Sequence, residues 1–390
     1  MTNALGDLHP RARPPLKKGI ILKSRLSYLS SRSERWAGKA FVLPAVLVVL
    51  FLSIFPLIVS LYLSFAHMRF FKGQLEINFV GWHNYYKLLF GSGKTHFLGL
   101  MRAPSLVGWL ILLGVVVLLA LMWVRYVRGK KMSIGETSWR LLASVVVLGG
   151  TGMLVYTLGN SGRPGTVSIT LIYVLFGISA QYLLGLGLAL MCVQRLPGQR
   201  FFRTIFLIPM MITPVGIAYL FRMLTDTGKG PLTPLWQALG WSGFSWTSDP
   251  WGARIAVMIG DLWQWTPFMF VVLLAALESR SKSQLEAAQV DGANAWAMFL
   301  HITVPQILPV SATLVLIRLI EAFKIVDLPN IMTNGGPGTA TESMTLQAYF
   351  AWRTLDLGGA SAIAYLLMVV VTLVCLTYFN LIHRKVAERL

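Results

Sequence analysis

Charged, amide and indole side chains stand inside two long apolar segments of the sequence, where they could bind a polar solute. The first segment carries Asp261, Gln264 and Trp265, and the second carries Arg318 and Glu321. Polar groups are costly in a membrane span and by default face a bundle interior or a water-filled path. Sugars are held by hydrogen bonds to their hydroxyls and by aromatic faces, so this mixture suits a sugar. The alternative is that the opposite charges only neutralise one another within the bundle and do not contact a solute.

No set of residues indicates catalysis or metal binding. The six histidines are scattered over tails, loops and segment edges, without the spacing of metal ligands. Cys192 and Cys375 lie in apolar segments, which predicts buried free thiols. The fragment GSGKT at 91–95 matches the end of a phosphate-binding loop, but that loop needs a glycine five residues before Gly93, where Leu88 stands. We therefore expect no catalytic residue, no metal and no cofactor in this chain, which disfavours an intramembrane enzyme.

Membrane-spanning helices are the elements that must position these residues. The chain is 55% hydrophobic and 13% charged, against about 25% charged in an ordinary soluble domain. A spanning helix needs about 20 apolar residues and satisfies its own backbone hydrogen bonds in lipid. The fold class is therefore all-α, a polytopic membrane helical bundle of about eight spans. We expect the spans near residues 41–65, 105–124, 139–158, 167–192, 204–223, 253–277, 306–326 and 361–381.

The net charge of +19 is chiefly a topology signal. The basic residues are neither interleaved with solvent-facing aromatics nor gathered in a soluble domain, which argues against a nucleic-acid partner. Nine of them precede the first span, so the positive-inside rule places the N-terminus in the cytoplasm. An even number of spans returns the C-terminus there, as expected for a multi-pass protein of the inner (cytoplasmic) membrane. The predicted outer loop 66–104 argues against this scheme, since it carries five basic residues and one acidic residue.

One predicted cytoplasmic loop has a composition that suits docking. It reads EAAQVDGANAWAMFLHITVP, Glu286 to Pro305, and lies between the sixth and seventh spans. Small helix formers favour a short helix, and Gly292 allows a close backbone approach. Trp296 and Phe299 are among its apolar anchors, and Pro305 is expected to end the element before the next span. The alternative interpretation is a plain amphipathic connector.

This loop closely resembles the EAA loop of ABC-importer permeases. The family pattern is Glu-Ala-Ala, three residues, Gly, nine residues, Ile, one residue, Leu and Pro. Val304 replaces the usual Leu, and the positions that match in register are Glu286, Ala287, Ala288, Gly292, Ile302 and Pro305. In the family the loop is a coupling helix that sits in a cleft of the ATPase subunit. The resemblance therefore implies an ATPase-coupling role for Glu286, Ala287, Ala288, Asp291, Gly292 and Phe299.

Other blocks look like carbohydrate permeases of the maltose-importer type. They are Ile325 to Trp352, Asp261 to Phe268 and the first outer loop, Phe79 to Leu89. Such permeases usually pass directly to the next core span, whereas this chain inserts a helix pair with a basic loop. The resemblance thus implies a six-helix type I importer core plus the inserted pair. The expected organisation is a basic cytoplasmic tail at 1–39, the first span and outer loop at 40–96, the inserted pair at 97–160, and the permease core at 161–390 with its coupling loop at 286–305.

The function implied by the resemblance is that of a permease subunit moving a sugar across the cytoplasmic membrane. Carried over by register, the sugar-contacting positions of maltose-type permeases fall on Asp261, Gln264, Trp265, Phe268, Arg318, Ala322 and Ile325. Glu321 joins them as a polar group of the same span. These side chains differ in type from those of the maltose protein, so the resemblance suggests the location of the site and not the identity of the sugar.

The same resemblance implies the partners of the chain. They are a second permease subunit in a heterodimer, two ATPase subunits that hold ATP and Mg, an extracytoplasmic binding protein that delivers the solute, and the lipid bilayer. The chain itself is then not an enzyme. Many importers share the EAA loop, so a permease for glycerol-phosphate, phosphate or polyamine is the alternative. A secondary transporter would be expected to show inverted repeats, which we do not identify in the sequence.

Overall fold

The computed structural model describes residues 41–71, 74–129, 134–159, 162–194, 198–241 and 244–380. The predicted basic tail 1–39 lies outside these ranges. The chain divides into two compact units, Met1–Ser60 and Leu61–Leu390. The described part of the first unit is helical and includes the π-helix η1 (Leu50–Ile54) and the start of α2 (Phe55–Ser64).

Long apolar helices dominate the described ranges. Seven are long and apolar enough to cross a membrane, and a bent pair of helices makes up to eight. This confirms the all-α polytopic fold. The seven are Phe41–Ser64, α5 (Leu106–Gly129), α6 (Ile134–Leu158), α7 (Thr166–Val193), α11 (Pro250–Glu278), the run Ala295–Ala322 and α17 (Leu357–Tyr378).

The bent pair corrects the span predicted at 204–223. Helix α8 (Gln199–Met211) and helix α9 (Pro214–Leu224) meet at an angle of 99° instead of forming one straight helix. Pro214 forces the preceding Thr213 into an extended conformation, with φ −64° and ψ 145°. The Thr213 hydroxyl then accepts a hydrogen bond from the Gly216 N–H at 3.4 Å, capping the new helix. A threonine followed by proline is a helix-start signal, and it overrides the apolar continuity of the segment.

The expectation that Pro305 ends the loop element is also wrong. Helix α13 (Ala295–Met298), the π-helix η2 (Phe299–Thr303) and α14 (Val304–Ala322) form one continuous helical run. Proline is tolerated in the first turn of an α-helix, where its missing N–H costs no hydrogen bond. The π-helical turn restarts the α-helical register so that Pro305 falls in that first turn.

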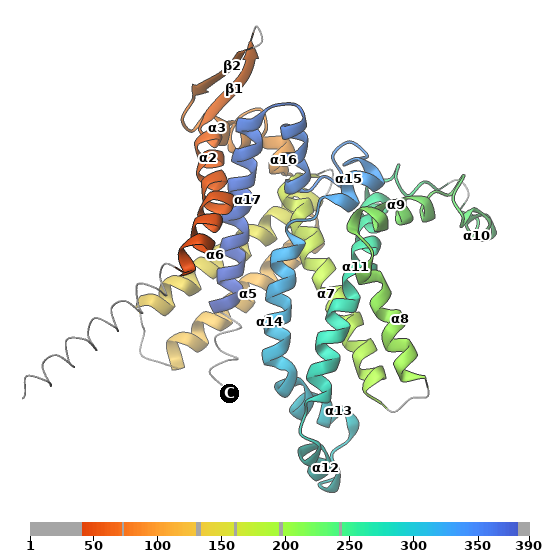
Figure 1. The fold of residues 1–390 in the computed structure, drawn as a ribbon. Helices are drawn as coiled ribbons and strands as arrows, with labels where there is room; N and C mark the ends of the chain where they lie inside the picture. Colours follow the sequence, from red (N-terminus) through yellow and green to blue (C-terminus); the bar gives the residue numbers. More distant parts are fainter. Residues whose placement is uncertain are drawn as a thin grey trace, which may run out of the picture. The chain divides into compact units, whose positions relative to one another are not determined.

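Shorter elements gather at the two ends of the long helices of the second unit. In Figure 1, α9, α15 and α16 lie at one end of α7, α11 and α14, whereas α12 and α13 lie at the other. We call these the α15 end and the α12 end. The remaining bounds are β1 (Ala66–Phe71) paired antiparallel with β2 (Gln74–Phe79), α3 (His83–Leu89), α4 (Lys94–Phe97), β3 (Gly99–Leu100) paired antiparallel with β4 (Arg163–Pro164), α10 (Thr233–Ala238), α12 (Lys282–Val290), α15 (Asp327–Thr333) and α16 (Met344–Arg353).

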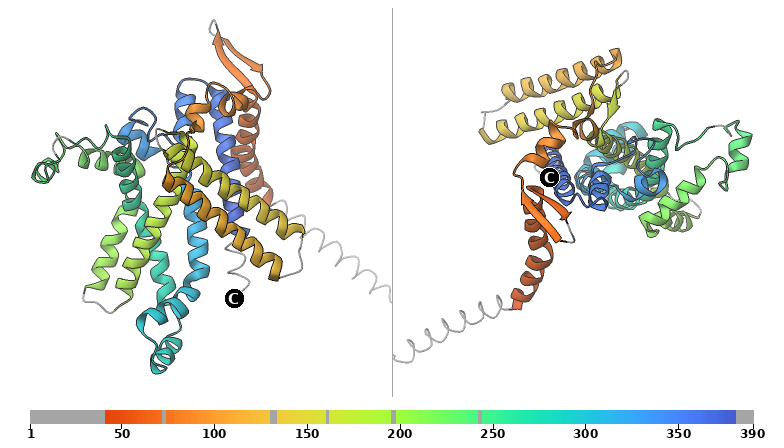
Figure 2. Two further views of the ribbon diagram at one scale, coloured as in Figure 1. Left: turned by 180° about the vertical axis from the view of Figure 1, so that it is seen from behind. Right: turned by 90° about the horizontal axis from the view of Figure 1, so that it is seen from above.

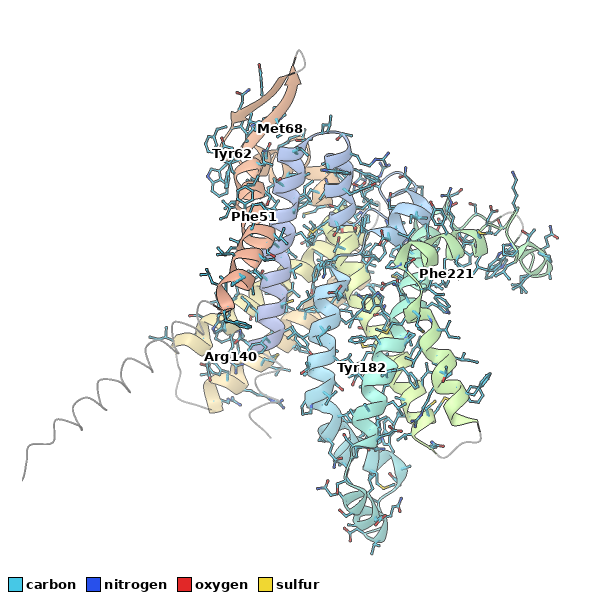
Figure 3. The ribbon with its side chains drawn as sticks, viewed as in Figure 1. Phe51, Tyr62, Met68, Arg140, Tyr182 and Phe221 are labelled. Atoms are coloured by element: carbon cyan, nitrogen blue, oxygen red, sulfur yellow. The ribbon has the colours of Figure 1, made fainter. Side chains whose placement is uncertain are left out.

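Helices α5 and α6 are the pair predicted within 97–160. They lie side by side and run obliquely to α7 and α14 (Figure 2). The indole N–H of Trp123 donates to Ser144 Oγ at 3.0 Å, and the Arg140 guanidinium lies 4.1 Å from the centre of the Tyr126 ring (Figure 3). Most of their apolar side chains are exposed, as suits contact with lipid. That the pair is inserted into a permease core stays a prediction.

The bundle core lies where α7, α11 and α14 pack together. Its buried apolar side chains include Val174, Phe270, Leu273, Ile307 and Leu314. Helix α7 packs closely against α11 at Gly185, where an added Cβ would lie 2.5 Å from Met269 Cβ and 2.9 Å from the Phe270 nitrogen. Small residues at such contacts let the backbones of membrane helices approach closely.

We predict that Gly185→Ala destabilises the bundle by about 1–3 kcal/mol, because the added methyl group forces α7 and α11 apart. Gly187→Ala is the matched control on the same helix, since an added Cβ there meets no described atom within 4 Å. That control should be neutral or slightly stabilising, because alanine favours a helix over glycine. Thermal unfolding in detergent measures both, and equal behaviour of the two variants would contradict the packing described.

Candidate functional site

A buried polar cluster stands at the centre of the three core helices. The Arg318 guanidinium on α14 donates through Nη2 to both carboxylate oxygens of Asp261 on α11, at 2.8 and 2.6 Å. Its Nε donates to Gln181 Oε1 on α7 at 2.8 Å, and Gln181 Nε2 donates back to Asp261 Oδ2 at 2.7 Å. Arg318 is 2% exposed, Asp261 6% and Gln181 0%. The three side chains therefore form a closed ring of hydrogen bonds, which we call the polar triad.

An aromatic side chain flanks the triad. The guanidinium carbon of Arg318 lies 4.4 Å from the ring centre of Trp265, and Trp265 meets Phe268 edge to face at 6.1 Å. Trp265 and Phe268 are only partly buried, whereas the triad is buried. The site thus offers an aromatic face beside a charge pair whose main hydrogen bonds are already satisfied.

The structure brings together only some of the predicted substrate residues. Asp261 and Arg318 bind each other, as the neutralisation alternative requires, and Trp265 lies beside them. Glu321 does not join the triad, because its Oε1 accepts from Lys324 Nζ at 2.7 Å. The rest are buried or partly buried neighbours on the same two helices or just after them: Gln264, Phe268, Ala322 and Ile325. Contact of any of them with a solute stays a prediction.

Sequence reasoning missed Gln181, the third member of the triad. A signal was present, since Gln181 is an amide within the otherwise apolar segment predicted at 167–192. The close approach of α7 to α11 is helped by Gly177, where an added Cβ would lie 3.4 Å from Asp261 Oδ2. Only the packing of the two helices shows that this amide faces the carboxylate.

The predicted coupling segment forms a helix-turn-helix at the α12 end. Helix α12 is followed by a turn, and Asn294 caps α13 by accepting from the Ala297 N–H at 2.7 Å. Gly292 has φ +80°, and no atom of the described residues lies within 4 Å of its added Cβ. Within this chain, therefore, the glycine is required for its left-handed backbone and not for a close approach.

Apolar side chains of this segment face outward. Val290 is 88% exposed and Trp296 is 66% exposed, while Trp296 stacks on Phe299 with ring centres 5.7 Å apart. Glu286 and Ala287 are also exposed. Exposed apolar side chains held on a short rigid element are typical of a surface that binds a partner.

A partly buried ion pair connects distant parts of the chain at the α15 end. His96 Nε2 on α4 lies 3.0 Å from Glu342 Oε2 just before α16, with the His96 side chain 40% exposed and that of Glu342 5% exposed. The hydrogen bond to Glu342 raises the pKa of His96 above its ordinary value, and the charge of Glu342 adds to this while burial opposes it. Within the described ranges, no group of three or more His, Cys, Asp or Glu could hold a metal ion.

Spanning helices packed around a buried polar centre are the architecture expected of a membrane transport subunit. The model of the family described as "Binding-protein-dependent transport system inner membrane component" matches residues 181–390, more than half of the chain. The chain belongs to this family. It is a permease subunit of an ABC importer. This confirms the class of protein expected from the resemblance to the EAA loop.

Similar proteins include three transport permeases. The trehalose/maltose transport system permease protein MalF of Thermococcus litoralis is 33% identical over 56% of this chain and 73% of its own length. The sulfoquinovosyl glycerol transport system permease protein SmoG of Agrobacterium fabrum is 33% identical over 56% and 70%. The sn-glycerol-3-phosphate transport system permease protein UgpA of Yersinia pestis is 32% identical over 56% and 74%.

A solved structure has the same fold. It is that of a bacterial ABC transporter involved in the import of the acidic polysaccharide alginate. The TM-score is 0.61 at 18% identity, and the likeness covers 92% of this chain and 99% of that chain. At this identity the likeness establishes the shared architecture alone.

We predict that Asp261→Ala destabilises the protein by about 3–5 kcal/mol, because it leaves the Arg318 charge buried without its partner. The double variant Asp261→Leu/Arg318→Met should recover part of this loss, since it removes both buried charges but leaves the Gln181 amide without its two side-chain partners. Unfolding by denaturant in detergent of Asp261→Leu, Arg318→Met and the double variant, analysed as a double-mutant cycle, gives the coupling energy. A single variant as stable as the parent would contradict a buried pair.

The His96–Glu342 pair should make stability depend on pH. A folded-state pKa above the unfolded value means that the contribution of His96 is complete below about pH 6.5 and is lost as pH rises through the raised pKa. Since His96 is partly exposed, we expect less than about 1 kcal/mol. The melting temperature of the parent should exceed that of His96→Gln at pH 6, and the two should converge by pH 9. A difference that is constant with pH would exclude the ion pair as its cause.

Proposed function

We propose that the chain imports a carbohydrate. The observation that supports this most directly is the composition of its buried centre, in which amide, carboxylate, guanidinium and indole groups meet within the region shared with the family. One of the similar permeases is named for the neutral carbohydrates trehalose and maltose. Another is named for sulfoquinovosyl glycerol, a sugar derivative whose sulfonate group makes it an anion. Hydrogen-bonding groups beside an aromatic face are the chemistry by which sugar rings are bound.

The proposed sugar site lies on the Trp265 side of the triad. Trp265 and Phe268 would offer aromatic faces, while Asp261 and Arg318 would offer polar atoms next to them. The other proposed contacts are Gln264, Glu321, Ala322 and Ile325. In this arrangement the ion pair has two roles, since it positions Trp265 and supplies polar atoms to the solute.

The charge balance of the centre favours a neutral solute over an organic phosphate. The similar UgpA protein is named for sn-glycerol-3-phosphate, which makes that cargo the second candidate. A phosphate group would need an available cation, because an uncompensated charge is costly in a buried site. Here the Arg318 guanidinium is already engaged by Asp261 at 2.6 and 2.8 Å. A phosphate could therefore bind Arg318 only by displacing Asp261, whereas a neutral carbohydrate would not have to displace it.

The proposed coupling element is the exposed helix-turn-helix at the α12 end. Its residues Glu286, Ala287, Ala288, Asp291, Gly292 and Phe299 would contact a partner ATPase that holds ATP and Mg. A second permease subunit, two ATPase subunits and an extracytoplasmic binding protein complete the proposed assembly. The proposed location is the inner (cytoplasmic) membrane. The α12 end would lie on its cytoplasmic side, and both chain termini would be cytoplasmic.

We predict that Trp296→Ala uncouples the importer. Trp296 is 66% exposed, and truncating a tryptophan hot spot at an interface costs about 2 kcal/mol or more, equivalent to about thirtyfold weaker binding. The measurement is ATP hydrolysis by the complete complex in lipid, stimulated by carbohydrate-loaded binding protein, together with retention of the ATPase on an affinity-tagged permease. We expect both to fall in the variant.

Trp109→Ala is the matched control, because Trp109 is 53% exposed on α5 and lies outside the coupling segment. It should retain both the ATPase and the stimulated hydrolysis. Full stimulation in Trp296→Ala would rule out this helix-turn-helix as the coupling element. Stimulation by sn-glycerol-3-phosphate and by no carbohydrate would favour the second cargo.

A further inference from the structure

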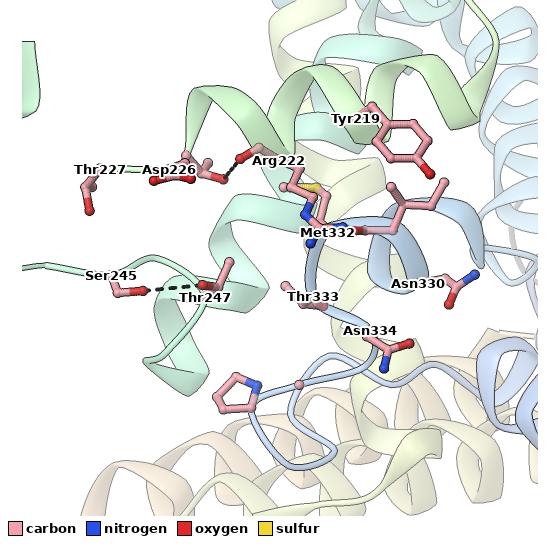
Figure 4. A pocket seen from close by; sticks show the side chains of 14 residues that line it. Tyr219, Arg222, Asp226, Thr227, Ser245, Thr247, Asn330, Met332, Thr333 and Asn334 are labelled. Atoms are coloured by element: carbon pink, nitrogen blue, oxygen red, sulfur yellow. Dashed lines mark hydrogen bonds between the residues drawn. The ribbon is translucent and has the colours of Figure 1, made fainter. Parts of the chain in front are cut away.

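A cavity of about 820 Å³ opens at the α15 end, between α9 with its following loop and α15 with its following turn (Figure 4). Its volume falls within the roughly 300–1,000 Å³ of small-molecule binding sites. Tyr219, Arg222 and Asp226 line one side, Asn330 and Asn334 another, and Thr247 a third. Nothing in the proposed transport path so far uses this cavity.

Helix α9 is amphipathic, and its polar face lines the cavity. Tyr219 and Arg222 are three residues apart and share one face of the helix, which borders the cavity. Ile217 and Phe221 point the other way, into an apolar cluster with Leu328. The bend at Pro214, which turns α9 by 99° from α8, is what presents the polar face of α9 to the cavity.

The apolar cluster separates the cavity from the polar triad. Met332 lines the cavity and also belongs to the cluster, which combines buried side chains of α9, α11 and α15. The cluster reaches Gly260, where an added Cβ would lie 2.6 Å from Leu328 and 3.6 Å from Phe221. Gly260 precedes Asp261 of the triad. The apolar cluster thus lies between the cavity and the turn of α11 that carries Asp261.

The lining has the chemistry of a carbohydrate site. It combines amides, hydroxyls and one aromatic ring, and its two charged side chains are held by the backbone. Arg222 Nη1 donates to the Ile331 carbonyl at 3.1 Å, and Asp226 Oδ1 accepts from the N–H groups of Gly228 and Lys229, each at 2.9 Å. Opposite charges fixed in this way leave a lining without net charge, rich in donors and acceptors for hydroxyl groups.

We infer that this cavity is a second carbohydrate-binding site, which receives the solute before it passes the apolar cluster to reach the triad. The inference rests on the proposed function, because it assigns the same cargo to a new place. A segment of the binding protein is the competing occupant. The concave shape and the polar, hydroxyl-rich lining favour a sugar, since protein docking surfaces have a more apolar centre.

Site-specific thiol labelling tests the inference. Thr247→Cys places a thiol in the lining, and Gln237→Cys on α10 is the control, because Gln237 is exposed and does not line the cavity. The native Cys192 and Cys375 lie within spanning helices and are buried and half-buried. The complete complex in lipid, without binding protein, is treated with a membrane-impermeant maleimide. The neutral carbohydrates maltose and trehalose are the probes, and each is also tested for stimulation of hydrolysis with binding protein present.

A carbohydrate that stimulates hydrolysis should slow the labelling of Thr247→Cys at least threefold and leave Gln237→Cys unchanged. Adding Asn330→Ala should raise the concentration needed for half-protection about fivefold, the usual effect of losing one hydrogen bond. Stimulation without protection would overturn the inference while the proposed function stands. Protection by sugar-free binding protein and by no carbohydrate would reassign the cavity to protein docking. Absence of stimulation by any carbohydrate would remove the proposed function, and the inference with it.

Discussion

The ion pair between Arg318 and Asp261 is the interaction on which the arrangement of the bundle depends. A charge buried without a partner costs several kcal/mol, so α11 and α14 must hold a register that keeps the two groups in contact. Gln181 extends the same constraint to α7 by accepting from Arg318 and donating to Asp261. Apolar packing alone would tolerate small shifts between these helices, whereas the hydrogen-bonded triad specifies one arrangement.

The helix that carries Arg318 also connects the proposed coupling element to the proposed solute site. The run Ala295–Ala322 is continuous, so Trp296 at the α12 end and Arg318 in the triad belong to one helical element. The two residues are 22 positions apart, which corresponds to about 33 Å at the helical rise. Movement of a partner against Trp296 would therefore be transmitted along α14 to the ion pair. Under the proposed function, this gives ATP hydrolysis a physical route to the solute site.

Much of this organisation could be predicted from the sequence. Long apolar runs identified the spanning helices, because lipid allows few alternatives to a helix. The fixed spacing of the EAA-like loop indicated the permease family to which the chain belongs. The failures have local causes. Capping by Thr213 ahead of Pro214 bends the predicted span at 204–223, and a π-helical turn carries the helix past Pro305. The partner of Asp261 and the role of Gln181 depend on how three helices rotate against each other, which no local pattern encodes.

The most direct test of the account is solute accumulation in proteoliposomes that contain the complete importer, with ATP and the binding protein supplied on their respective sides. Radiolabelled maltose, trehalose, sulfoquinovosyl glycerol, sn-glycerol-3-phosphate and spermidine would be compared, with and without this chain. The account predicts that a carbohydrate accumulates against its gradient only when ATP and this chain are both present. Accumulation of sn-glycerol-3-phosphate or spermidine, with no carbohydrate transported, would contradict it.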